Sequence, residues 1–77
     1  MNTIRETLDF ILKGIISESD QISVEEHQEG ELIIFEISAP ESLVGRIIGK
    51  EGKIIKSIRT ILNLSFPQTK FVLKIKD

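Results

Sequence analysis

The residues best suited to binding chemistry are two glycines, three positions apart, in a segment rich in isoleucine and bases. The segment reads Gly45-Arg46-Ile47-Ile48-Gly49-Lys50-Glu51-Gly52-Lys53-Ile54-Ile55. Glycine adopts positive φ without steric cost, and it leaves no side chain to keep a ligand away from the main chain. A helix that begins after Gly52 would add free N–H groups and a dipole that favours anions. We therefore predict a short loop that holds a phosphate backbone.

Basic side chains surround this loop: Arg46, Lys50, Lys53, Lys56 and Arg59. We predict phosphate contacts for the first three, with solvated surface charge as the alternative. For Lys56 and Arg59 the two interpretations are about equal. Glu51 is the exception in the loop, because a carboxylate there repels phosphate unless its side chain points outward and leaves binding to the backbone N–H groups.

Apolar residues at helical spacing predict a helix on each side of the loop. A short apolar run from Leu43 to Ile48 precedes it. After the loop, apolar residues recur at intervals of three and four positions, at Ile54, Ile55, Ile58, Ile61 and Leu62. Pro40 suits the first turn of the first helix, and Pro67 prevents continuation of the second, which we expect to end near residue 63.

The remaining segments predict one more helix and three strands. Thr3 and Glu6 have the spacing of a capping box, and an apolar stripe follows at Ile4, Leu8, Ile11, Leu12, Ile15 and Ile16. Alternating patterns predict strands at 21–28, 32–39 and 70–76, with a hairpin turn at Glu29-Gly30. The helix–loop–helix segment is long enough to return the last strand parallel to the second. We expect an α+β fold in the order α-β-β-α-α-β, with three helices on one face of a three-stranded mixed sheet.

Charge is divided unevenly between the two halves of the chain. The 77 residues carry a net charge of −2. Residues 1–45 hold two bases against ten acids, whereas residues 46–77 hold eight bases against two acids. Such asymmetry is a recognised sign of contact with nucleic acid, although two ordinary solvated faces explain it equally well.

The composition gives no indication of an enzyme, a cofactor or a metal site. The chain has no cysteine, and its single histidine, His27, lies at the polar end of a predicted strand. The glycine spacing does not fit the P-loop pattern G-x-x-x-x-G-K-[ST]. No secretory signal or membrane span is recognisable. We expect a cytoplasmic protein without catalytic activity.

The loop and its surroundings resemble the KH domain, in which a G-x-x-G loop between two helices clamps single-stranded nucleic acid. The residues that carry the resemblance are Gly49-Lys50-Glu51-Gly52, with Ile47 and Ile48 before them and Ile55 after them. Elements that precede the core strand–helix–helix–strand unit are typical of the type II arrangement. The resemblance covers residues 1–77 as a single KH domain, and it is closest to the small bacterial proteins of the KhpA or YlqC type.

This resemblance implies an RNA-binding protein, such as an RNA chaperone or a post-transcriptional regulator. Single-stranded RNA would lie in a groove between the two helices and a neighbouring sheet edge. The residues assigned to RNA binding are Gly45, Arg46, Ile48, Gly49, Lys50, Glu51, Gly52, Lys53, Ile55 and Lys56. Gly45 would keep the first helix slim beside RNA or serve close helix packing, while Ile48 and Ile55 would form the groove floor or part of the core. A preference for RNA over DNA rests on the resemblance alone.

A protein-interaction module is the alternative function. Members of the resembled family form homodimers and also associate with a larger Jag-like protein that carries its own KH domain. The acidic half of the chain offers a surface for a basic partner. Apolar surface left over at Ile54, Ile58 or Ile61 predicts a weak homodimer. Because one KH domain contacts only about four nucleotides, pairing would raise RNA affinity through multivalency.

Overall fold

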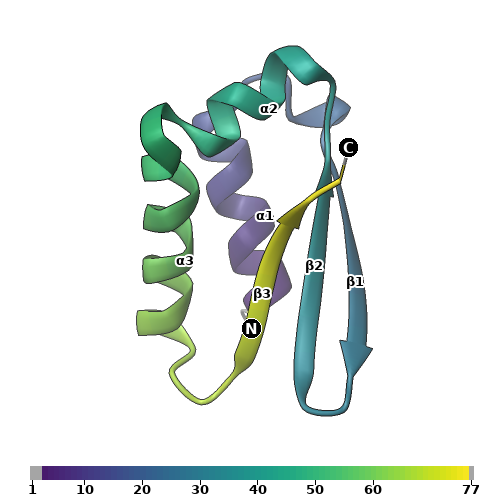
Figure 1. Ribbon diagram of the computed structural model, residues 1–77, viewed down its shortest axis with the longest axis vertical. Helices are drawn as coiled ribbons and strands as arrows, with labels where there is room; N and C mark the ends of the chain where they lie inside the picture. The colour runs from purple at the N-terminus through teal and green to yellow at the C-terminus, as the bar shows by residue number, and fades with distance from the viewer. Residues whose placement is uncertain (1–2, 77) are drawn as a thin grey trace.

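The computed structural model describes residues 3–76 as three helices packed on one face of a three-stranded sheet (Figure 1). The elements are α1 (Ile4–Ile15), the 3-10 turn η1 (Ser19–Gln21), β1 (Ser23–Glu29), β2 (Leu32–Ser38), α2 (Glu41–Ile48), the 3-10 turn η2 (Lys50–Gly52), α3 (Lys53–Ser65) and β3 (Lys70–Ile75). This order confirms the predicted α+β fold. Within the described residues, no helix combines the length and apolar character that crossing a membrane requires.

The sheet has β2 at its centre and is mixed, as predicted. β1 pairs with β2 antiparallel, and β3 pairs with β2 parallel, with Ile37 opposite Ile75. A two-residue turn, Gly30-Glu31, joins β1 to β2, and Gly30 has a φ of 62°. The turn lies one residue later than predicted, because Glu29 still pairs with Leu32 in the ladder.

α1 begins with the predicted capping box. Glu6 N donates to Thr3 Oγ1 at 3.1 Å, and Thr3 N donates to Glu6 Oε1 at 2.8 Å. The predicted apolar stripe is wrong at Ile15, whose side chain is 40% exposed. The helix ends there, and the extended backbone of Ile16 places the next side chain in the core instead.

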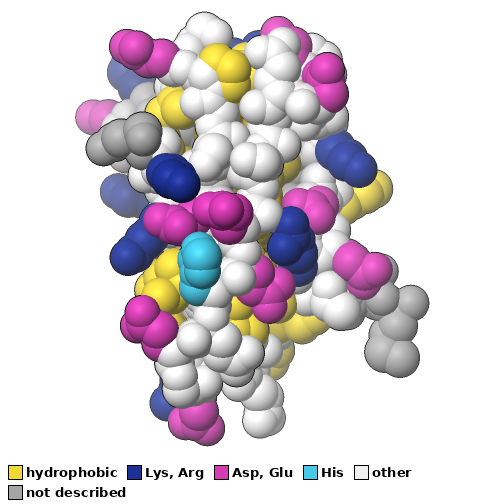
Figure 2. All heavy atoms as spheres, turned by 90° about the vertical axis from the view of Figure 1, so that its right-hand side faces the viewer, with side chains coloured by type: hydrophobic (Ala, Val, Ile, Leu, Met, Phe, Trp, Pro, Cys, Tyr) yellow, Lys and Arg dark blue, Asp and Glu magenta, His cyan; other side chains and the backbone are white. Residues whose placement is uncertain are grey.

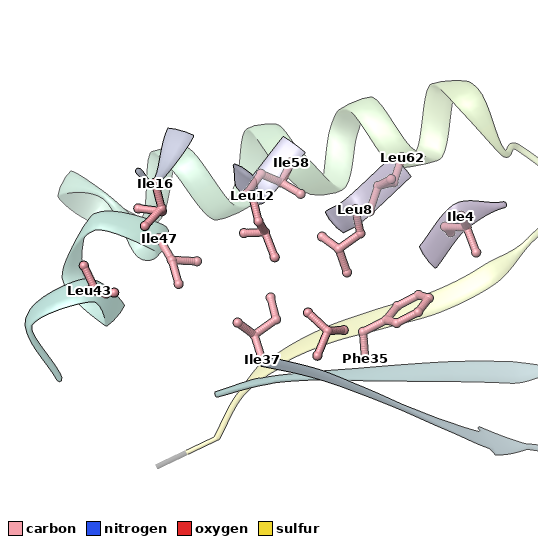
Figure 3. Packing of buried hydrophobic residues seen from close by; sticks show 11 residues of the cluster. Ile4, Leu8, Leu12, Ile16, Phe35, Ile37, Leu43, Ile47, Ile58 and Leu62 are labelled. Carbon is pink, nitrogen blue, oxygen red and sulfur yellow. The ribbon is translucent and has the colours of Figure 1, made fainter. Parts of the chain in front are cut away.

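The core lies between the helices and the inner face of the sheet (Figure 3). Phe35 and Ile37 of β2 are both 0% exposed and point toward the helices. The helices contribute Ile4, Leu8 and Leu12 from α1, Leu43 and Ile47 from α2, and Ile58 and Leu62 from α3. The two helices that flank the glycine loop therefore rest on one shared core, which fixes their relative position.

Cross-strand polar contacts cover the outer face of the sheet, which no helix covers. His27 Nε2 lies 3.0 Å from Glu36 Oε1, and Lys76 Nζ lies 3.7 Å from Glu25 Oε1. Ile34 is 8% exposed at the centre of this face. Figure 2 shows acidic and basic side chains interspersed on this side of the molecule. Some acids of the N-terminal half thus already contact basic groups of the chain, which weakens the case for a separate acidic surface.

Replacing Phe35 by Ala tests the core. We expect Phe35→Ala to lower the free energy of unfolding by about 3–5 kcal/mol, because it removes a fully buried ring and leaves a cavity. Phe10→Ala is the matched control, since Phe10 is 78% exposed and its loss should change stability by less than about 0.5 kcal/mol. Urea denaturation followed by circular dichroism measures both. Equal losses in the two variants would contradict this packing.

Candidate nucleic-acid interface

The loop between α2 and α3 has positive φ at three of its four residues. Gly49 ends α2 with φ 78° and ψ 173°, a region that is essentially restricted to glycine. Gly52, with φ 73° and ψ 16°, is left-handed, and so is Glu51, with φ 57° and ψ 24°. The predicted positive φ is confirmed at both glycines. Sequence reasoning missed Glu51, a residue type for which left-handed backbone costs roughly 1–2 kcal/mol.

Gly49 is required for space as well as for backbone conformation. A Cβ atom at this position would lie 2.6 Å from Ile54 Cγ1 and 2.9 Å from the main-chain nitrogen of Ile54. At Gly52 the nearest atom would be Lys56 Cε, at an ordinary 3.7 Å. Nothing lies within 4 Å of a Cβ at Gly45, so this residue serves no close helix packing within the described chain. Gly49 is thus the position where the main chain packs against the first turn of α3.

The N-terminus of α3 is left open to an anion. Gly52 stands at the N-cap and supplies no side-chain hydrogen bond, and the first turn contains no acidic residue. α1, by contrast, has its capping box. The N–H groups of a first helical turn have no partner within the helix. Lys53 N, the first of them, already donates to Lys50 O of η2. The helix dipole and the remaining N–H groups of the first turn favour an anion beside the glycine loop.

The lysines and arginines near the loop divide into paired and unpaired groups. Lys53 Nζ lies 4.0 Å from Glu51 Oε1, and both side chains are more than 70% exposed. Lys50, Lys56 and Arg59 take part in no ion pair among residues 3–76. Glu51 therefore points into solvent beside Lys53. Gly49 N donates to Gly45 O at 2.8 Å and Gly52 N to Gly49 O at 3.1 Å, so of the four loop N–H groups those of Lys50 and Glu51 are left for a ligand.

Arg59 shares one flank of α3 with Ile55, whereas Lys56 lines a hollow together with Lys53. At about 100° per residue, Arg59 lies about 40° from Ile55 around the helix and Lys56 about 100° from it. Ile55 is half-buried against the core, so this flank combines apolar surface with positive charge. Lys53 lies further around the helix, toward the opposite side.

Arg46 is bound within the protein, an arrangement that sequence reasoning missed. Its Nη1 donates to both carboxylate oxygens of Glu18, at 3.1 and 3.3 Å. The hydrogen bond from the Ser17 hydroxyl, with a smaller contribution from the charge of Arg46, lowers the pKa of the Glu18 carboxyl. Two residues along α2 correspond to about 200° of rotation, so Arg46 points nearly opposite to Ile48. No local pattern indicates a partner 28 residues away.

Ile48 lies on the other flank of α2, one turn beyond Val44, and both are half-buried. A shallow hollow beside this flank is lined by Ala39, Glu41, Val44 and Lys76. It brings α2 next to the end of β3, the edge strand of the sheet. The hollow thus joins the Val44 flank of α2 to the end of β3, whereas Ile48 and Ile55, the predicted groove floor, do not line it.

Among residues 3–76, no strand pairs with the outer edge of β3. Lys76 N donates to Ile37 O of β2 at 2.8 Å. Because backbone groups point to alternate sides along a strand, those of Ile75, Leu73 and Phe71 are directed toward the free edge. Their side chains pack against the core. Backbone donors and acceptors are thus available beside half-buried apolar side chains.

Possible metal ligands gather away from the loop. On the outer sheet face, ligand atoms of Glu25, His27 and Glu36 lie within 4.8 Å of one another. Glu36 already contacts His27, and Glu25 already contacts Lys76. These contacts account for the cluster without an ion.

Comparison with known proteins identifies the family. Residues 5–76 match the sequence model described as "KhpA/KhpB, KH domain". The chain is 39% identical over 59 residues to RNA-binding protein KhpA of Chlamydia pneumoniae, covering 77% of this chain and 76% of the relative. Proteins of the same name match from Thermotoga maritima, with 37% identity over 78% of this chain and 80% of the relative, and from Streptococcus pneumoniae serotype 4, with 34% identity over 80% and 78%.

A solved structure shares the fold. Era, in a crystal structure with MgGDPNP and nucleotides 1506–1542 of 16S ribosomal RNA, superposes with a TM-score of 0.54 at 23% identity. The match covers 94% of this chain and 27% of the Era chain, so this chain spans about a quarter of that protein. At this identity the likeness concerns the fold alone. The element order and the parallel β2–β3 pair are those of a type II KH domain, and the chain belongs to the KhpA/KhpB family of KH domains.

Proposed function

We propose that the protein binds a short run of single-stranded RNA across the loop Gly49–Gly52. In this proposal, phosphates contact the loop N–H groups, the first turn of α3 and the side chains of Lys50, Lys53 and Lys56. The bases lie in a groove beside Ile48 and Ile55. Curated relatives named as RNA-binding proteins support this function. No catalytic step belongs to the proposal.

The observation that carries the proposal is the conformation of the loop. Positive φ at Gly49, Glu51 and Gly52 turns the chain so that an uncapped helix N-terminus stands directly behind a loop with few side-chain obstacles. Lys50, in the same loop, has no carboxylate partner among residues 3–76. Donors, dipole and positive charge therefore favour the same ligand, an anion carried by a backbone that can approach closely.

Apolar surface beside the loop favours nucleic acid over an isolated phosphate as the ligand. Half-buried Ile48 and Ile55 provide apolar surface for bases, and Arg59 stands on the same flank as Ile55. The free backbone groups of β3 provide hydrogen-bond partners for base edges. Unstacked bases of single strands offer both apolar faces and polar edges for such contacts. The proposal includes a role as an RNA chaperone or a post-transcriptional regulator in the cytoplasm.

Self-association is the second candidate function, because apolar side chains remain exposed on the helices. They are Phe10 and Leu64, each 78% exposed, Ile61 at 45%, Ile15 at 40% and Ile54 at 37%. The prediction of an exposed Ile58 is wrong, since this residue is 2% exposed and belongs to the core.

Packing α3 of two copies together would cover Ile54, Ile61 and Leu64 and would place two RNA grooves in one particle. A larger Jag-like protein is the alternative occupant of this surface.

Charge reversal in the loop tests RNA binding. Lys50→Asp with Glu51→Asp changes the local charge by −2 but retains both glycines. We expect RNA affinity to fall by tenfold or more, about 1.4 kcal/mol, with a nearly unchanged melting temperature, since both residues are exposed. Fluorescence anisotropy with a labelled single-stranded RNA of random sequence measures the affinity. Full-strength binding by the double variant would rule out the loop as the clamp, and unfolding would assign it a structural role.

The two loop glycines should differ in their tolerance of a methyl group. Gly49→Ala should destabilise the domain more than Gly52→Ala, because its Cβ would come within 3 Å of Ile54. At Gly52 a Cβ meets no such clash, and the cost is only that of a left-handed backbone, roughly 1–2 kcal/mol. Thermal unfolding followed by circular dichroism compares the two. A larger loss at Gly52 would contradict the close approach of Gly49 to α3.

A charge on the exposed face of α3 tests self-association. We expect Leu64→Asp to raise the dimer dissociation constant by tenfold or more, since it places a carboxylate in apolar contact surface. Asn63→Asp is the matched control, because it adds the same charge one position away at another exposed site. Sedimentation velocity over a range of concentrations measures both. A wild-type protein that stays monomeric well above micromolar concentration would refute the dimer.

A further inference from the structure

The ion pair between Glu18 and Arg46 joins the last turn of α2 to the segment between α1 and β1. The two carboxylate oxygens lie 3.1 and 3.3 Å from Arg46 Nη1. Among residues 3–76, no other side-chain hydrogen bond connects α2 to the rest of the fold. Both side chains are about half exposed, 49% and 42%, so the pair is accessible to substitution without disturbing the core.

Glu18 is held in place by its own surroundings. Ser17 Oγ donates to Glu18 Oε1 at 2.8 Å, and Gln21 N donates to Glu18 O at 3.0 Å. Ile16, two residues earlier, is 1% exposed and fixes this segment to the core. The carboxylate therefore projects from a turn that hydrogen bonds hold in place, so its position relative to the guanidinium group is well defined.

α2 depends on such an anchor more than the other helices do. It has eight residues, no side chain caps it at Pro40 or Gly49, and its buried residues are Leu43 and Ile47. Helices this short owe their stability to tertiary contacts. Arg46 lies three residues before Gly49, so a contact on its flank restricts rotation of the turn that leads into the loop.

We propose that Glu18 is a positioning residue for RNA binding. Acting through Arg46, it fixes the last turn of α2 and thereby the direction in which the loop N–H groups face the RNA. Arg46 points away from Ile48 and from the groove, so in this proposal it orients the loop and does not contact phosphate. The inference rests on the proposed RNA-binding function and assigns that site a residue outside the glycine segment.

Neutralising Glu18 is the first test. Glu18→Gln should weaken binding of a labelled random-sequence single-stranded RNA by about 1.4- to fivefold, the range that corresponds to losing one exposed ion pair. Glu31→Gln is the matched control, because it makes the same charge change at the far hairpin, where Glu31 lies 4.0 Å from Lys70. Tighter binding by Glu18→Gln than by Glu31→Gln would overturn the proposal, since it would mean that Glu18 competes with phosphate for Arg46.

Exchanging the two charges is the second test. Arg46→Glu alone should weaken RNA binding, and adding Glu18→Arg should restore it to within about twofold of the wild type, because the pair re-forms with opposite polarity and the net charge is unchanged. If Arg46 contacts phosphate, the exchanged protein stays weak, because a carboxylate then stands where the phosphate passes. That result would overturn the proposal.

The salt dependence of Arg46→Gln separates orientation from direct contact. The slope of log affinity against log salt should equal that of the wild type, although the affinity is lower. A slope smaller by about 0.7 would show one lost phosphate contact and would overturn the positioning role. If the double variant Lys50→Asp with Glu51→Asp binds RNA as tightly as the wild type, the proposed function itself is refuted. Binding that responds to the loop but not to Glu18 would refute only this inference.

Discussion

The close approach of Gly49 to Ile54 is the contact on which the rest of the candidate site depends. α2 must end and α3 must begin within a four-residue loop, and the main chain of Gly49 lies where any Cβ would meet Ile54. Positive φ at Gly49, Glu51 and Gly52 completes the reversal. As a result, the first turn of α3 faces outward without a side-chain cap, at the place where we propose that phosphate binds. The left-handed backbone of Glu51 is the local cost of this arrangement.

The apolar core holds the two helices in the positions that this contact needs. Ile47 from α2 and Ile58 from α3 are both buried against Phe35 and Ile37 of β2. Because the buried set contains no polar or charged side chain among residues 3–76, the interior specifies position and carries no chemistry. The charged and polar groups of the described residues therefore lie at the surface, where the proposed RNA site would have to be.

Local charge governs this surface more than the net charge of −2 does. Exposed charges act over about one Debye length, roughly 10 Å at moderate salt, so the charges nearest the loop matter most there. Glu25 and Glu36 contact basic groups there, and Glu18 is occupied by Arg46. By contrast, two basic residues without an ion pair among residues 3–76 lie near the loop: Lys50 is in the loop itself and Arg59 is beside Ile55. A weakly acidic protein thus carries a local group of basic side chains around the loop.

The sequence by itself determined the elements, their order and the position of the loop, because each depends on residues close together in the chain. The capping box at Thr3, the alternation along β2 and the spacing of Gly49 and Gly52 are signals of this kind. The groove and the RNA contacts remain predictions from the family resemblance.

Tertiary structure decided which side chains of those elements are free. It buried Ile58 while it left Ile61 and Leu64 exposed, and it turned Ile16 inward where α1 ends at Ile15. It also paired Arg46 with Glu18, across 28 residues. Periodicity assigns a helix an apolar face but not its limits, which depend on the neighbouring elements. An ion pair between distant residues leaves no local pattern, because it exists only once the chain has brought both segments together.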